Sequence, residues 1–364
     1  MIRLSKHKRP ENLMFYKPFS LLALCLCAQA APDSGAFNAH AQAPGTATHA
    51  PSSTSAASAD DGKGLNDWLR RMHEASKNRA YIGTYVVSSG GQMQSAKIWH
   101  VCEGGQQTER VETLTGAPRS TFRHNEKMVT FMPEQKLVRQ EKREALSSFP
   151  EIVQSADHRI SDFYKLKLEG SERIAGVEAD IAVLQPKDAT RFGYRVWTEQ
   201  KRGLVVKLQT LDADGRVLEQ AAFSELLMDA PVKMDKLLQM MGKVEGYRVE
   251  QPALLKTTAS AEGWRLPAPV AGFKPMSCYK RPASAAAGVA AAEDSMQWVF
   301  SDGLASVSLF VESYDRQRHS KESGMSMGAT HTLTRQIGNY WLTAMGEVPM
   351  ATLKQFASGL ERKK

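Results

Sequence analysis

Two neighbouring stretches decide the fold class: Val177-Glu178-Ala179-Asp180-Ile181-Ala182-Val183 and Phe192-Gly193-Tyr194-Arg195-Val196-Trp197. In each, apolar residues recur at every second position, which is the pattern of a β-strand with one buried face. Turn signals rich in Gly and Asp separate such stretches, as at Ser89-Gly90-Gly91 and Asp212-Ala213-Asp214-Gly215. Short strands joined by such turns predict a twisted antiparallel sheet that begins near Tyr81.

A helix is predicted on the N-terminal side of this sheet. Apolar residues recur there at helical spacing, at Leu65, Trp68, Leu69, Met72 and Ala75. Because one stripe of this helix is apolar, we expect the sheet to curl around it. The first domain is therefore expected over residues 63–228.

A second domain is expected over residues 263–361. Strand patterns recur in it at residues 296–300, 305–312 and 337–345, and Pro349 is placed to open a final helix. Residues 229–262 contain a short Met-rich helical stretch at Met234–Met241 and are expected to form the linker between the domains. Together these patterns predict an α+β protein.

The first thirty residues have the pattern of an export signal. Basic residues precede an apolar stretch of about ten residues, 19–28, which is too short to span a bilayer. Ala28-Gln29-Ala30 then supplies the small residues of a cleavage site. Residues 31–62 are rich in Ala, Pro and Ser, so this leader is expected to be disordered.

Charge and motifs exclude several classes of function. The formal net charge of +8 falls to +4 without residues 1–30, which carry five basic residues and one acidic residue. This modest charge, with no basic-aromatic motif, argues against a nucleic-acid partner. The sequence also lacks a nucleophile elbow, an HExxH motif and a phosphate-binding loop, and its histidines are scattered. We therefore expect neither an enzyme nor a bound metal or cofactor.

Binding is the better-supported class of function, because the predicted strands and helix carry many large apolar and aromatic side chains. A half-open barrel with such a lining can hold an apolar ligand in its concave face. An ordinary core between helix and sheet would need the same residue types, and the sequence leaves both interpretations open. The candidate lining residues of a lipid pocket are Trp68, Met72, Tyr85, Trp99, Phe131, Tyr194 and Trp197.

A basic stretch and two cysteines add further candidates. Arg119, Arg123 and Arg139 belong to a run of basic residues that could hold lipid phosphates or an acidic partner, or simply form a solvated face. Cys102 and Cys278 are the cysteines outside the export signal. In an oxidising compartment they could form one disulfide between the domains or remain two separate thiols.

The order of several short motifs resembles the MucB/RseB family. The resemblance runs from about residue 65 to residue 360 and is carried by residues 114–123, 192–197, Trp264-Arg265-Leu266-Pro267, Phe300-Ser301-Asp302-Gly303-Leu304 and Gly346-Glu347-Val348-Pro349. It implies an N-terminal half-open antiparallel β-barrel similar to the lipoprotein carriers LolA and LolB, wrapped on helices. It also implies a smaller C-terminal α/β domain.

The same resemblance implies a role without catalysis. Family members bind the periplasmic part of a MucA/RseA-like transmembrane anti-sigma factor and shield it from regulated proteolysis, which restrains the sigma-E envelope-stress response. Lipid or lipopolysaccharide signals release that grip. We therefore expect a regulatory protein of the periplasm. A periplasmic lipid or lipoprotein carrier is the alternative, and a homo-oligomer is compatible with either.

Overall fold

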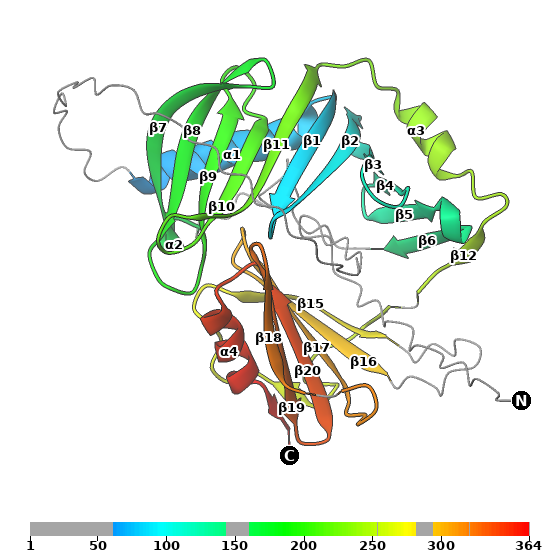
Figure 1. Cartoon of the computed structure of the whole chain (residues 1–364), viewed down its shortest axis with the longest axis vertical. Coiled ribbons are helices and arrows are strands. Elements are labelled where there is room, and N and C mark those ends of the chain that lie inside the picture. The colour runs from blue at the N-terminus through cyan, green and yellow to red at the C-terminus, as the bar shows by residue number, and fades with distance from the viewer. Residues whose placement is uncertain (1–60, 143–159, 253, 282–293, 320, 364) are drawn as a thin grey trace, which may run out of the picture.

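The computed structural model describes residues 61–142, 160–252, 254–281, 294–319 and 321–363. The expected export signal, and the expected leader up to residue 60, lie outside the described residues. Within those ranges the protein is mostly β, with a large N-terminal sheet and an antiparallel C-terminal sheet (Figure 1). No helix in these ranges is long and apolar enough to cross a membrane.

The N-terminal domain begins with helix α1 (Asp61–Asn78) and continues into a bent sheet. Over the described residues its strand order is β12-β6-β5-β4-β3-β2-β1-β11-β10-β9-β8-β7. The strands are β1 (Tyr81–Ser89), β2 (Gln92–Glu103), β3 (Gln106–Thr113), β4 (Ser120–His124), β5 (Lys127–Met132), β6 (Leu137–Lys142), β7 (Tyr164–Ile174), β8 (Val177–Pro186), β9 (Gly193–Glu199), β10 (Val205–Leu211), β11 (Val217–Met228) and β12 (Arg248–Glu250). The first strand of the domain, β1, pairs with β11 in the middle of the sheet, so strands from distant parts of the sequence lie side by side there.

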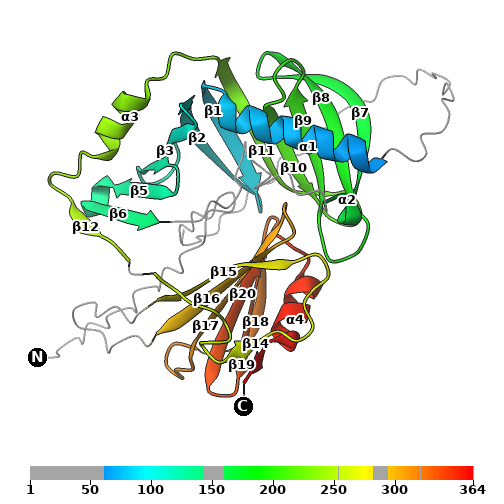
Figure 2. The same ribbon diagram turned by 180° about the vertical axis from the view of Figure 1, so that it is seen from behind.

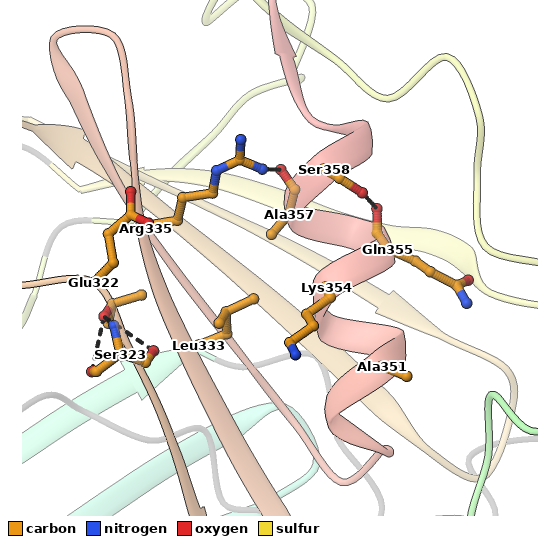
Figure 3. A pocket seen from close by; sticks show the side chains of 10 residues that line it. Glu322, Ser323, Leu333, Arg335, Ala351, Lys354, Gln355, Ala357 and Ser358 are labelled. Atoms are coloured by element: carbon orange, nitrogen blue, oxygen red, sulfur yellow. Dashed lines mark hydrogen bonds between the residues drawn. The ribbon is translucent and has the colours of Figure 1, made fainter.

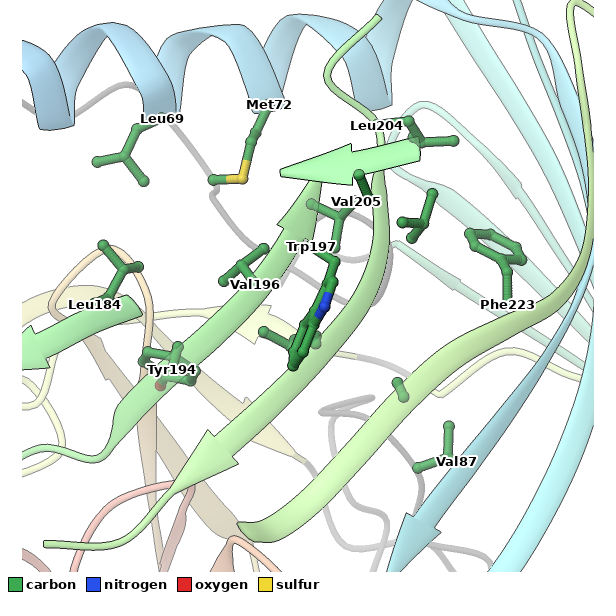
Figure 4. Close-up of a cluster of buried hydrophobic side chains, with 14 of the residues drawn as sticks. Leu69, Met72, Val87, Leu184, Tyr194, Val196, Trp197, Leu204, Val205 and Phe223 are labelled. Carbon is green, nitrogen blue, oxygen red and sulfur yellow. The ribbon is translucent and has the colours of Figure 1, made fainter. Parts of the chain in front are cut away.

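Helix α1 covers one face of this sheet at β8–β11 (Figure 2). Its apolar stripe is fully buried, with Leu65, Leu69 and Met72 at most 3% exposed. These side chains pack into the main core with strand residues such as Leu184 and Val196 (Figure 4). The apolar stripe of the helix and the apolar face of the strands thus pack together in one layer, as the sequence predicts.

The opposite face of the sheet is covered by a second helix, α3 (Met234–Met241), at β2–β4. Adjacent residues of a strand point to opposite faces, and β2 shows both contacts. Ile98 belongs to the core beneath α1, whereas Val101 packs against Met234 and Leu237 of α3. Two helices therefore cover two different faces in two different halves of the sheet.

Residues 229–262 do more than connect the domains. Besides α3 they provide β12, which pairs in parallel with β6, and β13 (Leu255–Lys256), which pairs with the C-terminal sheet. The helical pattern of the Met-rich stretch is confirmed, but the sequence did not predict these two strands. They are three and two residues long, too short for a recognisable alternation.

The C-terminal domain is an antiparallel sheet with one face covered by helix α4 (Met350–Gly359). Its strand order over the described residues is β13-β15-β16-β17-β20-β19-β18. The strands are β15 (Lys274–Arg281), β16 (Ser295–Ser301), β17 (Ser306–Ser313), β18 (Ser323–Met327), β19 (Thr330–Ile337) and β20 (Tyr340–Gly346). The remaining elements are η1 (Pro133–Gln135), α2 (Ile160–Phe163), β14 (Trp264–Arg265) and β21 (Glu361–Arg362).

Two of the three strands expected in this domain are confirmed as β16 and β17, and Pro349 stands at the start of α4 as expected. The third expected strand, residues 337–345, is wrong at its start. Ile337 ends β19, and Gly338, with a φ of 58°, turns the chain into β20. The positive φ that glycine adopts freely makes the tight hairpin possible.

We expect Leu69→Ala to lower the free energy of unfolding by about 2–5 kcal/mol, because it leaves a cavity between α1 and the sheet. Urea unfolding followed by tryptophan fluorescence measures the loss. The matched control is Leu227→Ala, since the Leu227 side chain is 58% exposed. The control should change stability by less than about 0.5 kcal/mol, and equal losses for the two variants would contradict the packing described.

Candidate functional site

A buried ion pair joins the two domains. Arg191, in the loop between β8 and β9, has no exposed side-chain surface, and its Nε donates a 2.8 Å hydrogen bond to Oδ2 of Asp302. Asp302 lies in the turn between β16 and β17 and is equally buried. Two charges without contact to water are stable only when further hydrogen bonds satisfy both groups.

The guanidinium of Arg191 meets that condition with groups from both domains. It donates hydrogen bonds to the Asp188 carboxylate in its own loop and to the backbone carbonyl of Ala271 in the C-terminal domain. It also lies over the rings of Phe163 and Phe273, at 4.3 and 5.1 Å from the ring centroids. The cation is enclosed between an aromatic side chain of each domain.

The carboxylate of Asp302 is equally well supplied. It accepts hydrogen bonds from the backbone N–H groups of Leu304 and Ala305, and from the hydroxyl of Tyr164 at 3.3 Å. Burial raises the pKa of the Asp302 carboxyl from its ordinary value, although these N–H groups and the charge of Arg191 oppose the rise. Tyr164 belongs to the N-terminal domain, so Asp302 is anchored there twice.

The domains approach each other closely around this pair. Gly272 has a φ of +84°, and a Cβ on it would lie 2.8 Å from the Phe163 ring and would also collide with Arg191. On another side, Oγ1 of Thr352 in α4 donates to the carbonyl of Thr190 at 2.9 Å. Only glycine fits at position 272, because the position needs both a left-handed backbone and no side chain.

A second contact joins two hairpin tips. Gly328, between β18 and β19, lies against Ser89 at the end of β1, and a Cβ on it would stand 3.1 Å from Oε2 of Glu219 on β11. Ser89 donates a 2.7 Å hydrogen bond to the same carboxylate oxygen. Glu219 is only 5% exposed. The tip of β18–β19 is therefore fixed against the two central strands of the N-terminal sheet.

His331 on β19 forms a third contact across the junction. Its ring meets that of Phe192 edge to face, with centroids 5.6 Å apart. Burial lowers the pKa of His331 from its ordinary value, although a hydrogen bond with the backbone of Val348 opposes the change. The charged form of this ring is therefore disfavoured where the domains meet.

The structure divides the candidate pocket residues between the two faces of the sheet. Met72 and Tyr194 are buried in the core beneath α1, and Trp68 and Tyr85 pack against the same core. These four side chains are brought together as the sequence suggested. They fill space between α1 and the strands, so in this structure they contribute to an apolar core.

The other three candidates have different surroundings. Trp99 and Phe131 pack in the clusters beneath α3 and its C-terminal extension. Trp197 pairs with Lys207 across the strands, whereas its neighbour Val196 pairs with Leu208 of the main core. The Lys207 ammonium lies 4.1 Å from the centre of the Trp197 ring. Trp197 nevertheless belongs to the same buried cluster as Met72 and Tyr194, whereas Trp99 and Phe131 belong to other clusters.

Comparison with known proteins explains the two-domain arrangement. The model of the MucB/RseB N-terminal domain matches residues 64–241, and the model of the MucB/RseB C-terminal domain matches residues 258–361. The chain belongs to the MucB/RseB family. This family consists of regulatory proteins rather than enzymes.

Individual relatives within the MucB/RseB family agree over most of the chain. The sigma factor AlgU regulatory protein MucB of Pseudomonas aeruginosa is 26% identical over 315 residues, covering 80% of this chain and 89% of that protein. The sigma-E factor regulatory protein RseB of Escherichia coli K12 is 22% identical, covering 80% and 89%. The solved structure of the P. aeruginosa MucA/MucB complex matches with a TM-score of 0.64 and 23% identity, covering 83% of this chain and 99% of that chain. A second structure, MucB in complex with MucA(peri), gives a TM-score of 0.62, so the fold is shared.

In this MucB/RseB protein the three candidate arginines have different surroundings. Arg123 pairs with Glu109 at 3.2 Å and Arg139 pairs with Glu250 at 3.0 Å. Arg119 makes no ion pair with any residue that the structure describes, and its buried Nε has no hydrogen-bond partner there. Partial burial lowers the pKa of Arg119 from its ordinary value. Of the three, Arg119 is the cation best placed to gain from an acidic ligand.

The cysteines of this MucB/RseB protein are both free thiols. Cys102 is half-buried on β2 of the N-terminal domain, and Cys278 is buried on β15 of the C-terminal domain. Of the two alternatives that the sequence left open, the structure has the separate thiols. Among the described residues no group of His, Cys, Asp and Glu side chains is arranged to hold a metal ion.

Sequence reasoning missed the residues on which the junction depends. Asp302 stands in a Ser-Asp-Gly turn, a pattern that predicts an exposed loop, and Arg191 follows a polar loop. The motif Phe300-Ser301-Asp302-Gly303-Leu304 carries part of the family resemblance. Nothing in the motif itself distinguishes a buried Asp from an Asp in an exposed turn.

We expect Asp302→Ala to lower the free energy of unfolding by about 3–5 kcal/mol, because it removes the buried carboxylate at Nε of Arg191 and leaves the cation with only the half-exposed Asp188. The double variant Arg191→Met/Asp302→Leu should recover much of this loss, since it removes both charges and keeps the volume. Urea unfolding compares the three proteins. Asp214→Ala is the control, since Asp214 forms an exposed pair with Arg216. A loss below about 1 kcal/mol for Asp302→Ala would contradict the account.

The lowered pKa of His331 predicts a loss of stability in acid. A folded state that resists protonation keeps its full stability above the unfolded-state pKa of about 6.5 and loses it as the pH falls below that value. The thermal midpoint of the wild-type protein should therefore fall more between pH 7.5 and 5.5 than that of His331→Phe, which keeps an aromatic ring against Phe192. Leu227→Ala, a change at a non-titrating and exposed side chain, should behave as wild type. Equal shifts for wild type and His331→Phe would show that the prediction is wrong.

Proposed function

We propose that this protein is a periplasmic regulator that binds the periplasmic part of a transmembrane anti-sigma factor and shields it from regulated proteolysis. It thereby restrains the sigma-E envelope-stress response, and lipid or lipopolysaccharide signals release it. The observation that carries the proposal is the match of both domains, in order, to a family of sigma-factor regulators. The solved complexes of MucB with MucA support the class of partner.

The mechanism needs only binding free energies. A lipid relieves the inhibition if it binds more tightly to the state of the protein that does not hold the anti-sigma factor. The coupling is reciprocal, so the anti-sigma factor must weaken lipid binding by the same factor. A coupling free energy of about 1–3 kcal/mol changes the partner affinity roughly 5- to 150-fold, which is enough for a switch.

The N-terminal domain is the proposed ligand domain, as a half-open barrel of the LolA/LolB type. Its sheet is open over the described residues, because β7 and β12 stand at opposite ends of the strand order. Helix α1 lies on one face and is the element that an acyl chain would displace from the core around Met72 and Tyr194. Arg119, a partly buried cation, is the proposed contact for a lipid phosphate.

A lipid or lipoprotein carrier is the second candidate, favoured by the same open sheet. A carrier needs nothing from the C-terminal domain. Here, however, the N-terminal domain places Arg191 where the C-terminal Asp302 and Ala271 must satisfy it. A permanent junction of this kind supports a protein in which both domains act together, as a regulator requires.

The test is protection of the partner. The first regulatory protease cleaves the periplasmic segment of the cognate anti-sigma factor. The purified protein should slow this cleavage at least about tenfold when the protein is in excess over the segment, so that most of the segment is bound. Lipopolysaccharide micelles should restore cleavage, and the partner should in turn reduce lipopolysaccharide binding by an equal factor. Binding can be measured by calorimetry with each ligand alone and with both together.

The outcomes separate the two candidates. A protein that leaves the cleavage rate unchanged at saturating concentration is not a regulator of this kind. If it also transfers labelled phospholipid between vesicles, and Arg119→Ala slows that transfer, the carrier function holds instead. Protection that lipopolysaccharide does not relieve would contradict the release step alone.

A further inference from the structure

Strand β18 offers a free backbone edge. It stands at the end of the C-terminal sheet over the described residues, and its side chains are exposed except at the last position. Its sequence, Ser323-Gly324-Met325-Ser326-Met327, contains no charge and no proline, the devices that keep exposed edges from pairing. An unprotected edge is a template for an added strand.

Other edges of the same molecule are protected. Strand β7 carries charged side chains at Lys165, Lys167 and Arg173, and its pairing is interrupted by a bulge next to Gly170. Strands β12 and β13 are only three and two residues long. Because charges, a bulge or shortness guard these edges, the bare edge at β18 is a specific feature of that strand.

A groove of about 500 Å³ lies beside this edge, between β18–β19 and helix α4 (Figure 3). Small residues create it. Gly324 pairs with Leu333, and a Cβ on Gly324 would approach Met350 of α4, so this position faces the helix without a side chain. Ala351 and Ala357 face the same space from α4, and Leu333 forms part of its lining. A strand added at β18 could place an apolar side chain there.

The rim of the groove is more positive than negative. Lys354 and Arg335 face it together with one carboxylate, that of Glu322. Glu322 accepts a hydrogen bond from the backbone N–H of Gln336 and Arg335 donates to the carbonyl of Ala357 at 3.5 Å. Lys354 is exposed and forms no ion pair with any residue that the structure describes. The complementary ligand carries a negative charge next to an apolar side chain.

We propose that β18 and the groove beside α4 bind an extended peptide segment by strand addition, with an apolar side chain in the groove and an adjacent acidic side chain at Lys354. The inference rests on the proposed function, in that the segment belongs to the periplasmic part of the anti-sigma factor. A second copy of β18 fits less well, because the acidic residue next to the strand, Glu322, already accepts a hydrogen bond from the backbone N–H of Gln336. The groove is also separate from the α1-covered face proposed for lipid.

The site would also be linked to the other domain. The end of β18 leads into Gly328, which lies against Ser89 and Glu219 of the N-terminal sheet. An added strand would therefore lengthen a sheet whose edge hairpin is already fixed to β1 and β11. Binding at β18 would therefore depend on the position of β1 and β11.

Hydrogen exchange and two substitutions test the proposal on the full-length protein. The probe is the purified periplasmic segment of the cognate anti-sigma factor. At saturation it should slow amide exchange in residues 324–327 at least about tenfold. Ala351→Trp should fill the groove and weaken affinity more than about tenfold at any salt concentration. Lys354→Glu should weaken it about fivefold at low salt and less at 0.5 M NaCl, as expected for a rim charge.

Matched controls are Gln239→Trp and Lys236→Glu, which make the same kinds of change at exposed positions of α3. Both should bind within about twofold of wild type. If the wild type binds while residues 324–327 exchange freely and both groove variants bind normally, the inference is overturned and the proposed function stands. If exchange slows with protein concentration alone, a second copy occupies the edge and the inference is overturned. If the wild type does not bind the segment, both proposals fall.

Discussion

The buried pair between Arg191 and Asp302 constrains the rest of the structure. A guanidinium with no exposed surface needs hydrogen-bond partners, and this one takes one of its two carboxylates and a carbonyl from the other domain. The attraction within such a pair roughly offsets the cost of removing both charges from water. Its importance is therefore geometric: any separation of the domains that leaves either charge buried and alone is strongly disfavoured. The orientation of the C-terminal sheet is fixed by a charge in the N-terminal domain.

Given that fixed orientation, the smaller contacts form a continuous path between the two proposed binding regions. Tyr85 and Phe223 of the main core lie on β1 and β11, and their rings meet edge to face. The same two strands carry Ser89 and Glu219, which meet Gly328 at the tip of the β18–β19 hairpin. The strands that a ligand beneath α1 would contact are therefore also the strands that hold the hairpin of β18 in place.

The fold was predictable where a single period governed a long segment. The alternation at residues 177–183 and 192–197 gave β8 and β9, and the helical spacing from Leu65 to Ala75 gave α1. The candidate pocket residues are divided by a constraint that the sequence already contained. Ile98 and Trp99 are adjacent in β2, so they point to opposite faces, and only Ile98 reaches the core of Met72 and Tyr194. Asp302 was unpredictable because a buried Asp and an exposed Asp occupy the same kind of turn, and only tertiary structure brings Arg191 to it.

On the face of the sheet that α1 covers, the side chains change from apolar to polar between β2 and β12. This change bears on the class of ligand. One cross-strand row of directly paired residues runs through Ile98, Val111, Thr121, Thr130 and Arg139 to Glu250. It begins apolar at β2 and β3, becomes hydroxylic at β4 and β5, and ends in an ion pair at β6 and β12. Directly opposite residues of paired strands share a face, so the row is a cross-strand arrangement that no window along the sequence can show. Because Arg139 and Glu250 neutralise each other, the row ends in a polar pair without a net charge. The change from apolar to polar along the row supports the amphipathic ligand that we propose for this domain.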